Sequence, residues 1–202
     1  MKDLIILVPD KNIQSTFNGI LQRHISLNIR KIHYDIFIHS NRDPGVYSKA
    51  AEFLRPFFNK YNYSLVILDK EGSGQEGKST EETCKKIKEK LECNGWDKRA
   101  EIILIEPELE IWAWTDSVHM AQAVGWQNYT ELKNFIINKG LWPEHMPKPL
   151  HPKEAFELAL REKKIPRSSS IYKQIADNVT FTRCEDRSFR KLLVILQTWF
   201  GI

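Results

Sequence analysis

Short apolar runs that alternate with amphipathic stretches are the feature that most constrains the fold of this chain. The runs have the length of strands and lie at residues 4–8, 32–39, 64–68 and 101–105. Between them, apolar residues recur with the 3.6-residue period of a helix, as at Ile13, Phe17 and Ile20. Strands that alternate with helices predict an α/β fold with a mostly parallel, four-stranded sheet and helices on both faces.

Turn and capping residues predict where the helices of this half begin and end. The sequence Asn-Arg-Asp-Pro-Gly at residues 41–45 predicts a turn, with a helix from about Val46 that Pro56 ends or kinks. Ser79 and Glu82 form a capping box that opens the next helix, and Gly95 ends it.

The chain changes character after residue 107, where the strand signal disappears. Helical faces follow at residues 109–114, 118–124, 130–138, 152–163, 171–178 and 186–200. A proline-rich stretch at 142–152 predicts a stiff connector. We therefore expect an α/β core at residues 1–115 and a helical C-terminal region at 116–202 that packs on it.

The composition is that of an ordinary globular protein, with 42% hydrophobic and 28% charged residues among 202. The apolar runs are too short to span a bilayer, so no membrane partner is expected. Three cysteines form no C-x-x-C pair, and no His/Cys cluster has zinc spacing. We expect a reducing, cytoplasmic setting.

Positive charge is concentrated near the C-terminus. The segment from residue 161 to residue 191 contains four acids and nine basic residues. The basic residues are Arg161, Lys163, Lys164, Arg167, Lys173, Arg183, Arg187, Arg190 and Lys191. This excess predicts contacts with a polyanion such as nucleic acid, and a solvated helix surface is the alternative. The candidate phosphate contacts are Lys173, Arg187 and Arg190.

Acidic residues follow three of the four predicted strands, and two more come just beyond the last. They are Asp10, Asp69, Glu71, Glu106, Glu108 and Glu110. Ligands of open parallel sheets bind outside the carboxyl ends of the strands, and carboxylates that converge there suit Mg²⁺ or Mn²⁺. We predict Asp69, Glu71, Glu106, Glu108 and Glu110 as metal ligands. Asp10, Asp69 and Glu71 are the catalytic candidates. Ordinary turn and helix-start acids are the alternative.

A phosphate-binding loop is a competing interpretation of the same region. Residues 72–79, GSGQEGKS, match G-x-x-x-x-G-K-[ST] between a strand and a helix. Gly77, Lys78 and Ser79 would then bind the nucleotide of a hydrolase or kinase. Only one predicted strand follows this loop, and Asp69 and Glu71 would repel phosphates, so the pattern favours the metal interpretation.

Two further residues have alternative roles. His39 ends the second predicted strand, where it is either a general base or a core histidine with satisfied hydrogen bonds. Trp112 and Trp114 are two residues apart and do not share a helical face, so we expect one in the core and the other at an interface or stacked on a base.

The order of these motifs resembles the Toprim-like domains, which are Rossmann-like and related to topoisomerases, primases and OLD-type nucleases. An acid follows the first strand, Asp-x-acid-Gly follows a later one, and PELEIW follows the last. More narrowly, the chain is similar to a bacterial family of Toprim-like proteins found with phage-defence and DNA-modification systems. The RSFRKLL segment at 187–193 is similar to that family's tail, so the resemblance covers nearly the whole chain.

The resemblance assigns roles to particular residues. Asp10 stands where the family has its first-strand glutamate, Asp69 and Glu71 match its Asp-x-Asp pair, and Glu108 and Glu110 fall within PELEIW. The chain departs from the pattern in having Pro-Asp-Lys where the family has Glu-Gly, and Glu71 where it has aspartate.

The resemblance implies a Mg²⁺- or Mn²⁺-dependent protein that processes phosphodiesters, as a nuclease component of a bacterial anti-phage defence system. Nucleic acid and other defence-system proteins are the implied partners. A catalytically degenerate subunit that binds a partner protein or DNA is the second hypothesis. The nucleotide hydrolase or kinase is the third.

Overall fold

The computed structural model describes residues 1–181 and 184–202, and contains a four-stranded, all-parallel sheet. The strands are β1 (Lys2–Val8), β2 (Tyr34–Ile38), β3 (Tyr61–Asp69) and β4 (Ala100–Ile105). They lie in the order β2-β1-β3-β4. The predicted α/β class with a parallel sheet is confirmed.

The strand order gives this sheet a topological switch point. Leu7 of β1 pairs with Phe37 of β2 on one side and with Val66 of β3 on the other. The chain thus passes from β1 to β2 on one side, then crosses to β3 and β4 on the other. Ligands of such sheets bind outside the carboxyl ends of the strands that flank the reversal, here β1 and β3.

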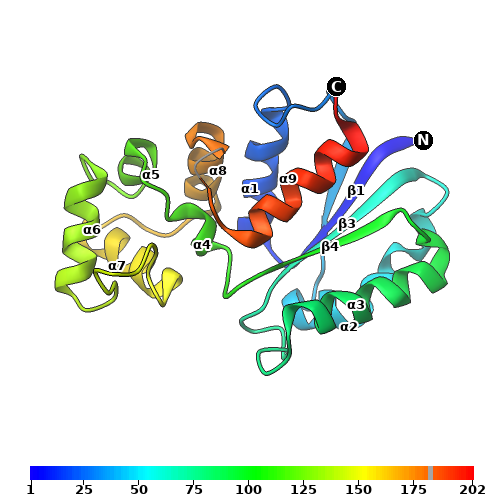
Figure 1. Cartoon of the computed structure of the whole chain (residues 1–202), viewed down its shortest axis with the longest axis horizontal. Helices are drawn as coiled ribbons and strands as arrows, with labels where there is room; N and C mark the ends of the chain where they lie inside the picture. Colours follow the sequence, from blue (N-terminus) through cyan, green and yellow to red (C-terminus); the bar gives the residue numbers. More distant parts are fainter. Residues whose placement is uncertain (182–183) are drawn as a thin grey trace.

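Strands β1, β3 and β4 bury residues on both faces, which explains their continuous apolar runs, while the edge strand β2 is only partly buried. One face, including Leu4 and Ile6, packs with α1 (Lys11–Gln22) and α9 (Arg187–Phe200). The other, including Ile5, packs with α2 (Arg42–Leu54) and α3 (Thr80–Leu91). Figure 1 shows these helices on opposite sides of the sheet. A fully buried aliphatic side chain contributes about 1.5–3 kcal/mol, so the two cores anchor the sheet.

Side-chain caps set the start of α1 and α3. Asp10 Oδ1 accepts hydrogen bonds from the backbone N–H groups of Asn12 and Ile13, at 2.8 and 3.0 Å. Ser79 Oγ accepts from the N–H of Glu82 at 3.0 Å, as predicted, while the Glu82 carboxylate accepts from the Lys86 ammonium. Such caps contribute about 1 kcal/mol each.

The predicted turn at residues 41–45 is wrong, because α2 begins at Arg42. Pro44 occupies the third helical position, where its missing N–H has no intrahelical partner to lose. A methyl group on Gly45 would overlap the His39 ring, so glycine is required here by the close approach of helix and strand end. The helix ends at Leu54, just before Pro56, as predicted.

His39 itself is a core residue. It is buried, and its Nδ1 accepts a hydrogen bond from the N–H of Asn41 at 3.1 Å. Burial lowers its pKa, and Lys49 lowers it further. These contacts favour the satisfied core histidine over the general base.

Beyond β4 the described chain is helical, close to the predicted bounds. Before β4, α3 is followed by a short turn, η2 (Glu92–Trp96), in which Gly95 has a φ of +92°. The later helices are α4 (Glu110–Ala113), α5 (Val118–Ala123), α6 (Tyr129–Asn138), α7 (Pro152–Glu162), α8 (Ser169–Asn178) and α9. In Figure 1 α5, α6 and α7 extend beyond the carboxyl edge of the sheet, while α8 lies along α1.

Both tryptophans of the PELEIW region are buried, so the expectation that one lies at an interface or stacks on a base is wrong. Trp112 is 6% exposed and Trp114 1%. The Trp112 Nε1 donates to Asp186 and Ser188, and that of Trp114 to the Pro152 carbonyl. Helix α4 has only four residues and Trp114 lies past its end, so the helical-face argument does not apply.

Two findings bear on the expected setting. In the part of the chain that the structure describes, no helix combines the length and apolar character needed to cross a bilayer. The thiols of Cys84, Cys93 and Cys184 are all free, and Cys184 is buried.

The close packing at Gly45 gives a stability prediction. We expect Gly45→Ala to lower the free energy of unfolding by about 1–3 kcal/mol, because the added methyl group forces His39 or α2 to move. Gly77→Ala is the matched control, since nothing lies within 4 Å of its added methyl group. Urea denaturation measures both, and equal midpoints for the two variants would contradict the expectation.

Candidate metal centre at the carboxyl edge of the sheet

A cleft of about 560 Å³ opens at the carboxyl edge of the sheet, beside the switch point. The segments that follow all four strands line it. They supply Asp10, Asn12, Ser40, Asn41, Arg42, Asp43, Pro44, Asp69, Glu71, Gly72, Glu108, Leu109 and Glu110. Lys153 of α7 and Arg167, which precedes α8, complete the wall. The predicted convergence of strand-end acids is therefore found for Asp10, Asp69, Glu71, Glu108 and Glu110.

Asp69, the last residue of β3, lines the cleft. Its backbone N–H donates to Asp43 Oδ1 at 2.8 Å. The residue is partly exposed, but its own Oδ1 is inaccessible and accepts no hydrogen bond from any described residue. Burial raises the pKa of Asp69 well above its usual range, and the neighbouring Asp43, Glu110, Asp10 and Glu108 raise it further. Among the described residues, one carboxylate oxygen of this cluster thus has no hydrogen-bond partner.

Asp43 is the acid that the sequence prediction missed. It lies in the first turn of α2, the helix whose start was predicted four residues too late. Burial raises the pKa of Asp43 to about 6, and the nearby Asp10 also raises it. The hydrogen bond from the Asp69 N–H lowers the pKa, but by less. Its position shortly after β2, the one strand without an adjacent acid, was the available signal.

Asp10 both caps helix α1 and lines the cleft. The hydrogen bonds that its Oδ1 accepts from the start of α1 fix the carboxylate where it lines the cleft. An anion at a helix N-terminus is also stabilised by the helix dipole. The cleft therefore includes one carboxylate whose position α1 determines.

Glu110 and Glu108 are neutralised by the protein itself. Glu110 is 2% exposed and accepts from Arg167 Nη2 at 2.6 Å and from the Tyr172 hydroxyl at 2.5 Å. Glu108 lies 3.4 Å from Lys153 Nζ. Burial raises the pKa of Glu108, and so does Glu110, while Lys153 opposes the rise. Two of the predicted metal ligands thus already have cationic partners.

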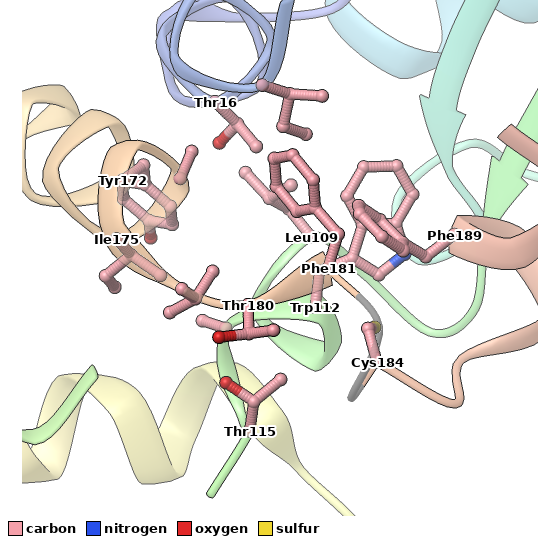
Figure 2. Close-up of a pocket in the computed structure, with 14 residues that line it drawn as sticks. Thr16, Leu109, Trp112, Thr115, Tyr172, Ile175, Thr180, Phe181, Cys184 and Phe189 are labelled. Atoms are coloured by element: carbon pink, nitrogen blue, oxygen red, sulfur yellow. The ribbon is translucent and has the colours of Figure 1, made fainter. Parts of the chain in front are cut away.

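Tyr172 connects the cleft to a small apolar cavity behind it. Figure 2 shows its ring among the residues that line this cavity of about 40 Å³, with Ile175 beside it on α8 and Thr16 opposite on α1. Burial raises the pKa of Tyr172, and Glu110 raises it further, so the hydroxyl stays a proton donor. An apolar backing strengthens the hydrogen bond to Glu110.

Two predicted metal ligands differ from this pattern. Glu106 does not line the cleft, because its carboxylate accepts from Lys70 Nζ at 2.6 Å and from the Thr80 hydroxyl at 2.8 Å. Glu71 does line it, but as an exposed residue at the rim. Its backbone N–H donates to the Pro107 carbonyl at 2.9 Å, which ties the loop after β3 to the segment after β4.

Lys78 and Ser79 of the phosphate-loop pattern already have partners within the protein. Lys78 Nζ donates to the Gln75 side-chain oxygen at 2.7 Å, and Ser79 caps α3. Gly72 and Gly74 have φ values of +79° and +76°, as expected in a tight loop. Of the pattern, only Gly72 lines the acidic cleft, among the residues that the structure describes.

The predicted phosphate contacts lie away from the cleft. Lys173 pairs with Asp177 on α8 at 2.7 Å. Arg187 is 93% exposed and lies 3.2 Å from Glu81, and Arg190 is exposed on α9. Arg183 lies outside the described residues. The basic residues that do line the cleft are Arg42, Lys153 and Arg167.

A divalent cation fits the chemistry of the cleft, although its ligands are not in place. In the described part of the chain, no group of three or more acidic, histidine or cysteine side chains is arranged to hold a metal ion. The partnerless Oδ1 of Asp69, beside Asp43 and Asp10, is nevertheless a hard oxygen donor of the kind that Mg²⁺ and Mn²⁺ prefer.

The buried charge of Asp69 gives a prediction for the protein without metal. We expect Asp69→Asn to raise the free energy of unfolding at pH 7.5 by about 2 kcal/mol, because it removes an uncompensated carboxylate. A carboxyl with a raised pKa destabilises the fold only above its unfolded pKa, so the gain should vanish as the pH falls below about 4.

Chemical denaturation between pH 3.5 and 8 in EDTA measures this difference. Glu71→Gln is the control, because the residue lies in the same cleft but is exposed, and we expect a change within about 0.5 kcal/mol. A gain from Asp69→Asn that does not depend on pH would contradict the electrostatic explanation.

Comparisons of the chain with models of protein families, with curated proteins and with solved structures give no significant match.

Proposed function

We propose that the cleft binds Mg²⁺ or Mn²⁺ and that the protein processes phosphodiester bonds, as a nuclease component of a bacterial anti-phage defence system. One observation carries the metal assignment: the inaccessible Asp69 Oδ1 has no partner among the described residues and lies within a cluster of acids. A buried carboxylate in this state needs either a proton or a cation.

The charge of the cleft supports a cation. Of the described residues that line it, six are acidic and three are basic: Asp10, Asp43, Asp69, Glu71, Glu108 and Glu110 against Arg42, Lys153 and Arg167. The formal charge is therefore −3, and one or two divalent ions would neutralise most of it. Oxygen-only ligands favour Mg²⁺ or Mn²⁺ over zinc.

Four of these six acids have a role in this proposal. Asp69 and Asp43 hold the ion from the floor of the cleft, and Asp10 is a ligand or a general base. Glu71 lies at the rim, where it can reach the substrate. A bound divalent ion supplies an activated water and stabilises the leaving oxygen of a phosphodiester.

The substrate and the defence setting rest on the resemblance to the Toprim-like domains. The acids that carry this resemblance line one cleft at the switch point of a parallel sheet: Asp10, Asp69, Glu71, Glu108 and Glu110. An edge of this kind is where α/β proteins bind their ligands. The fold and the acidic cleft therefore support a phosphodiester substrate, which a nuclease assay tests.

A specific observation also favours the second candidate, a catalytically degenerate subunit that binds DNA or a partner protein. Glu110 is held by Arg167 and Tyr172, and Glu108 by Lys153. If these pairs persist when substrate binds, two of the acids expected to hold metal are withdrawn from it. Tight binding of DNA without cleavage in Mg²⁺ or Mn²⁺ would identify this case.

The metal assignment predicts a thermal shift. We expect Mn²⁺ to raise the melting temperature, because an ion that binds only the folded chain adds about 2.7 kcal/mol at one hundred times its dissociation constant. Asp69→Ala should abolish the shift, while Glu106→Gln, altered outside the cleft, should keep it. No shift in the wild-type chain would refute the metal site.

The nuclease assignment is tested on the same variants with DNA and RNA in Mn²⁺. Cleavage that Asp10→Asn and Asp69→Asn abolish, and Glu106→Gln preserves, would support the enzyme. A metal-dependent thermal shift without cleavage of either nucleic acid would favour the degenerate subunit.

The contacts of Lys78 lead to a prediction for the nucleotide hydrolase or kinase, the third hypothesis. Because its ammonium group is bonded to Gln75, we expect ATP with Mg²⁺ to stabilise the wild type and Lys78→Ala to the same extent. Differential scanning fluorimetry measures both. A stabilisation by ATP that Lys78→Ala removes would instead support the phosphate loop.

A further inference from the structure

Lys153 and Arg167 are cationic side chains inside an acidic cleft, each paired with a glutamate. Arg167 donates to Glu110 at 2.6 Å, to Tyr172 at 2.8 Å and, through Nη1, to Glu157 at 2.8 Å. Lys153 lies 3.4 Å from Glu108. The side chain of Lys153 is 45% exposed and that of Arg167 is 32% exposed, so a ligand in the cleft can reach both.

These ion pairs occupy the same glutamates that a cation would use. When Glu108 and Glu110 turn to a cation held by Asp69, Lys153 loses its glutamate and Arg167 keeps only Glu157 of its two, while both stay in the wall of the cleft. A partly buried cation that has lost a carboxylate partner favours an incoming anion. The planar guanidinium group of Arg167 matches phosphate oxygens in a two-pronged geometry, and the lysine adds a point charge.

We propose that Lys153 and Arg167 form a substrate-phosphate site that becomes available only when the acids of the cleft hold a divalent cation. The inference rests on the proposed metal site. It makes the binding of cation and phosphate mutually dependent, because each removes the unpaired charge that the other leaves behind.

A second groove indicates that the ligand is a strand with several phosphates. Arg167 also lines this neighbouring hollow of about 550 Å³, at the C-terminal end of α7. The groove includes Arg161 and Lys164, both exposed, and its acid, Glu157, is already bonded to Arg167. Phosphates on either side of the scissile one can therefore follow a basic path out of the cleft.

The test measures binding rather than cleavage. A fluorescent single-stranded oligonucleotide is titrated with protein in EDTA and in Ca²⁺ or Mn²⁺ at matched ionic strength, and its anisotropy is followed. We expect the wild type to bind about tenfold more tightly with the divalent ion, the equivalent of one charge-assisted hydrogen bond. Lys153→Gln and Arg167→Gln should lose this gain but keep the Mn²⁺ thermal shift.

Matched variants locate the strand. Arg161→Gln and Lys164→Gln should weaken oligonucleotide binding about threefold each and leave competition by inorganic phosphate unchanged, since they contact only flanking phosphates. Lys173→Gln and Arg190→Gln, altered on α8 and α9 away from the cleft, should have no effect. The Lys153 side chain is the more exposed of the two, so Lys153→Gln still tests the inference if Arg167→Gln does not fold.

The outcomes separate this inference from the proposed function. A Mn²⁺ thermal shift with equal oligonucleotide affinity in EDTA and in divalent ion would overturn the inference and leave the metal site standing. Metal-dependent binding that Lys173→Gln or Arg190→Gln abolishes, while Lys153→Gln and Arg167→Gln preserve it, would also overturn it. Absence of any Mn²⁺ shift would end both proposals.

Discussion

Repulsion among carboxylates at one edge of the sheet is the constraint on which the candidate site depends. A parallel sheet directs every strand toward the same edge, so the residues that follow the strands meet there. The protein relieves this repulsion in two ways: the helix start of α1 binds Asp10, and cationic side chains bind Glu108 and Glu110. Asp69 keeps an oxygen with no partner among the described residues, so its charge stays uncompensated without a proton or a cation.

The rest of the fold makes such a destabilised edge tolerable. Both faces of the sheet are covered, by α1 and α9 on one side and α2 and α3 on the other, and the C-terminal helices share a core with β1 and α1. Stability is supplied by these apolar contacts, so the acidic edge does not have to contribute to it. Proteins commonly place strained or repulsive groups at sites of function and compensate elsewhere.

The sequence predicted the fold well because periodicity is a local signal. The parallel sheet, the cap at Ser79 and the C-terminal helices follow from apolar spacing and capping residues within single segments. The errors at Asp43 and Trp114 had local causes of their own: a proline tolerated in a first turn, and a helix too short to have distinct faces.

The site was predictable only in part. Acids could be placed at strand ends, but their partners come from distant residues: Arg167 is 57 residues from Glu110 along the chain. No local pattern shows that Glu110 is occupied or that Glu106 bonds to Lys70 and Thr80. Pairing across the C-terminal half decides which carboxylates remain available, and that information lies in the packing of α7 and α8.

The cap that Asp10 provides has one more consequence. The carboxylate that lines the cleft also accepts hydrogen bonds from the N–H groups of Asn12 and Ile13. The first turn of α1 is therefore directly bonded to a residue of the site. Any ligand that draws charge from Asp10 weakens those two bonds, and their hydrogen-exchange rates then report the state of the cleft from inside a helix. Helix α1 also packs along α8, which carries Tyr172, so the helix that Asp10 caps is in contact with the C-terminal half.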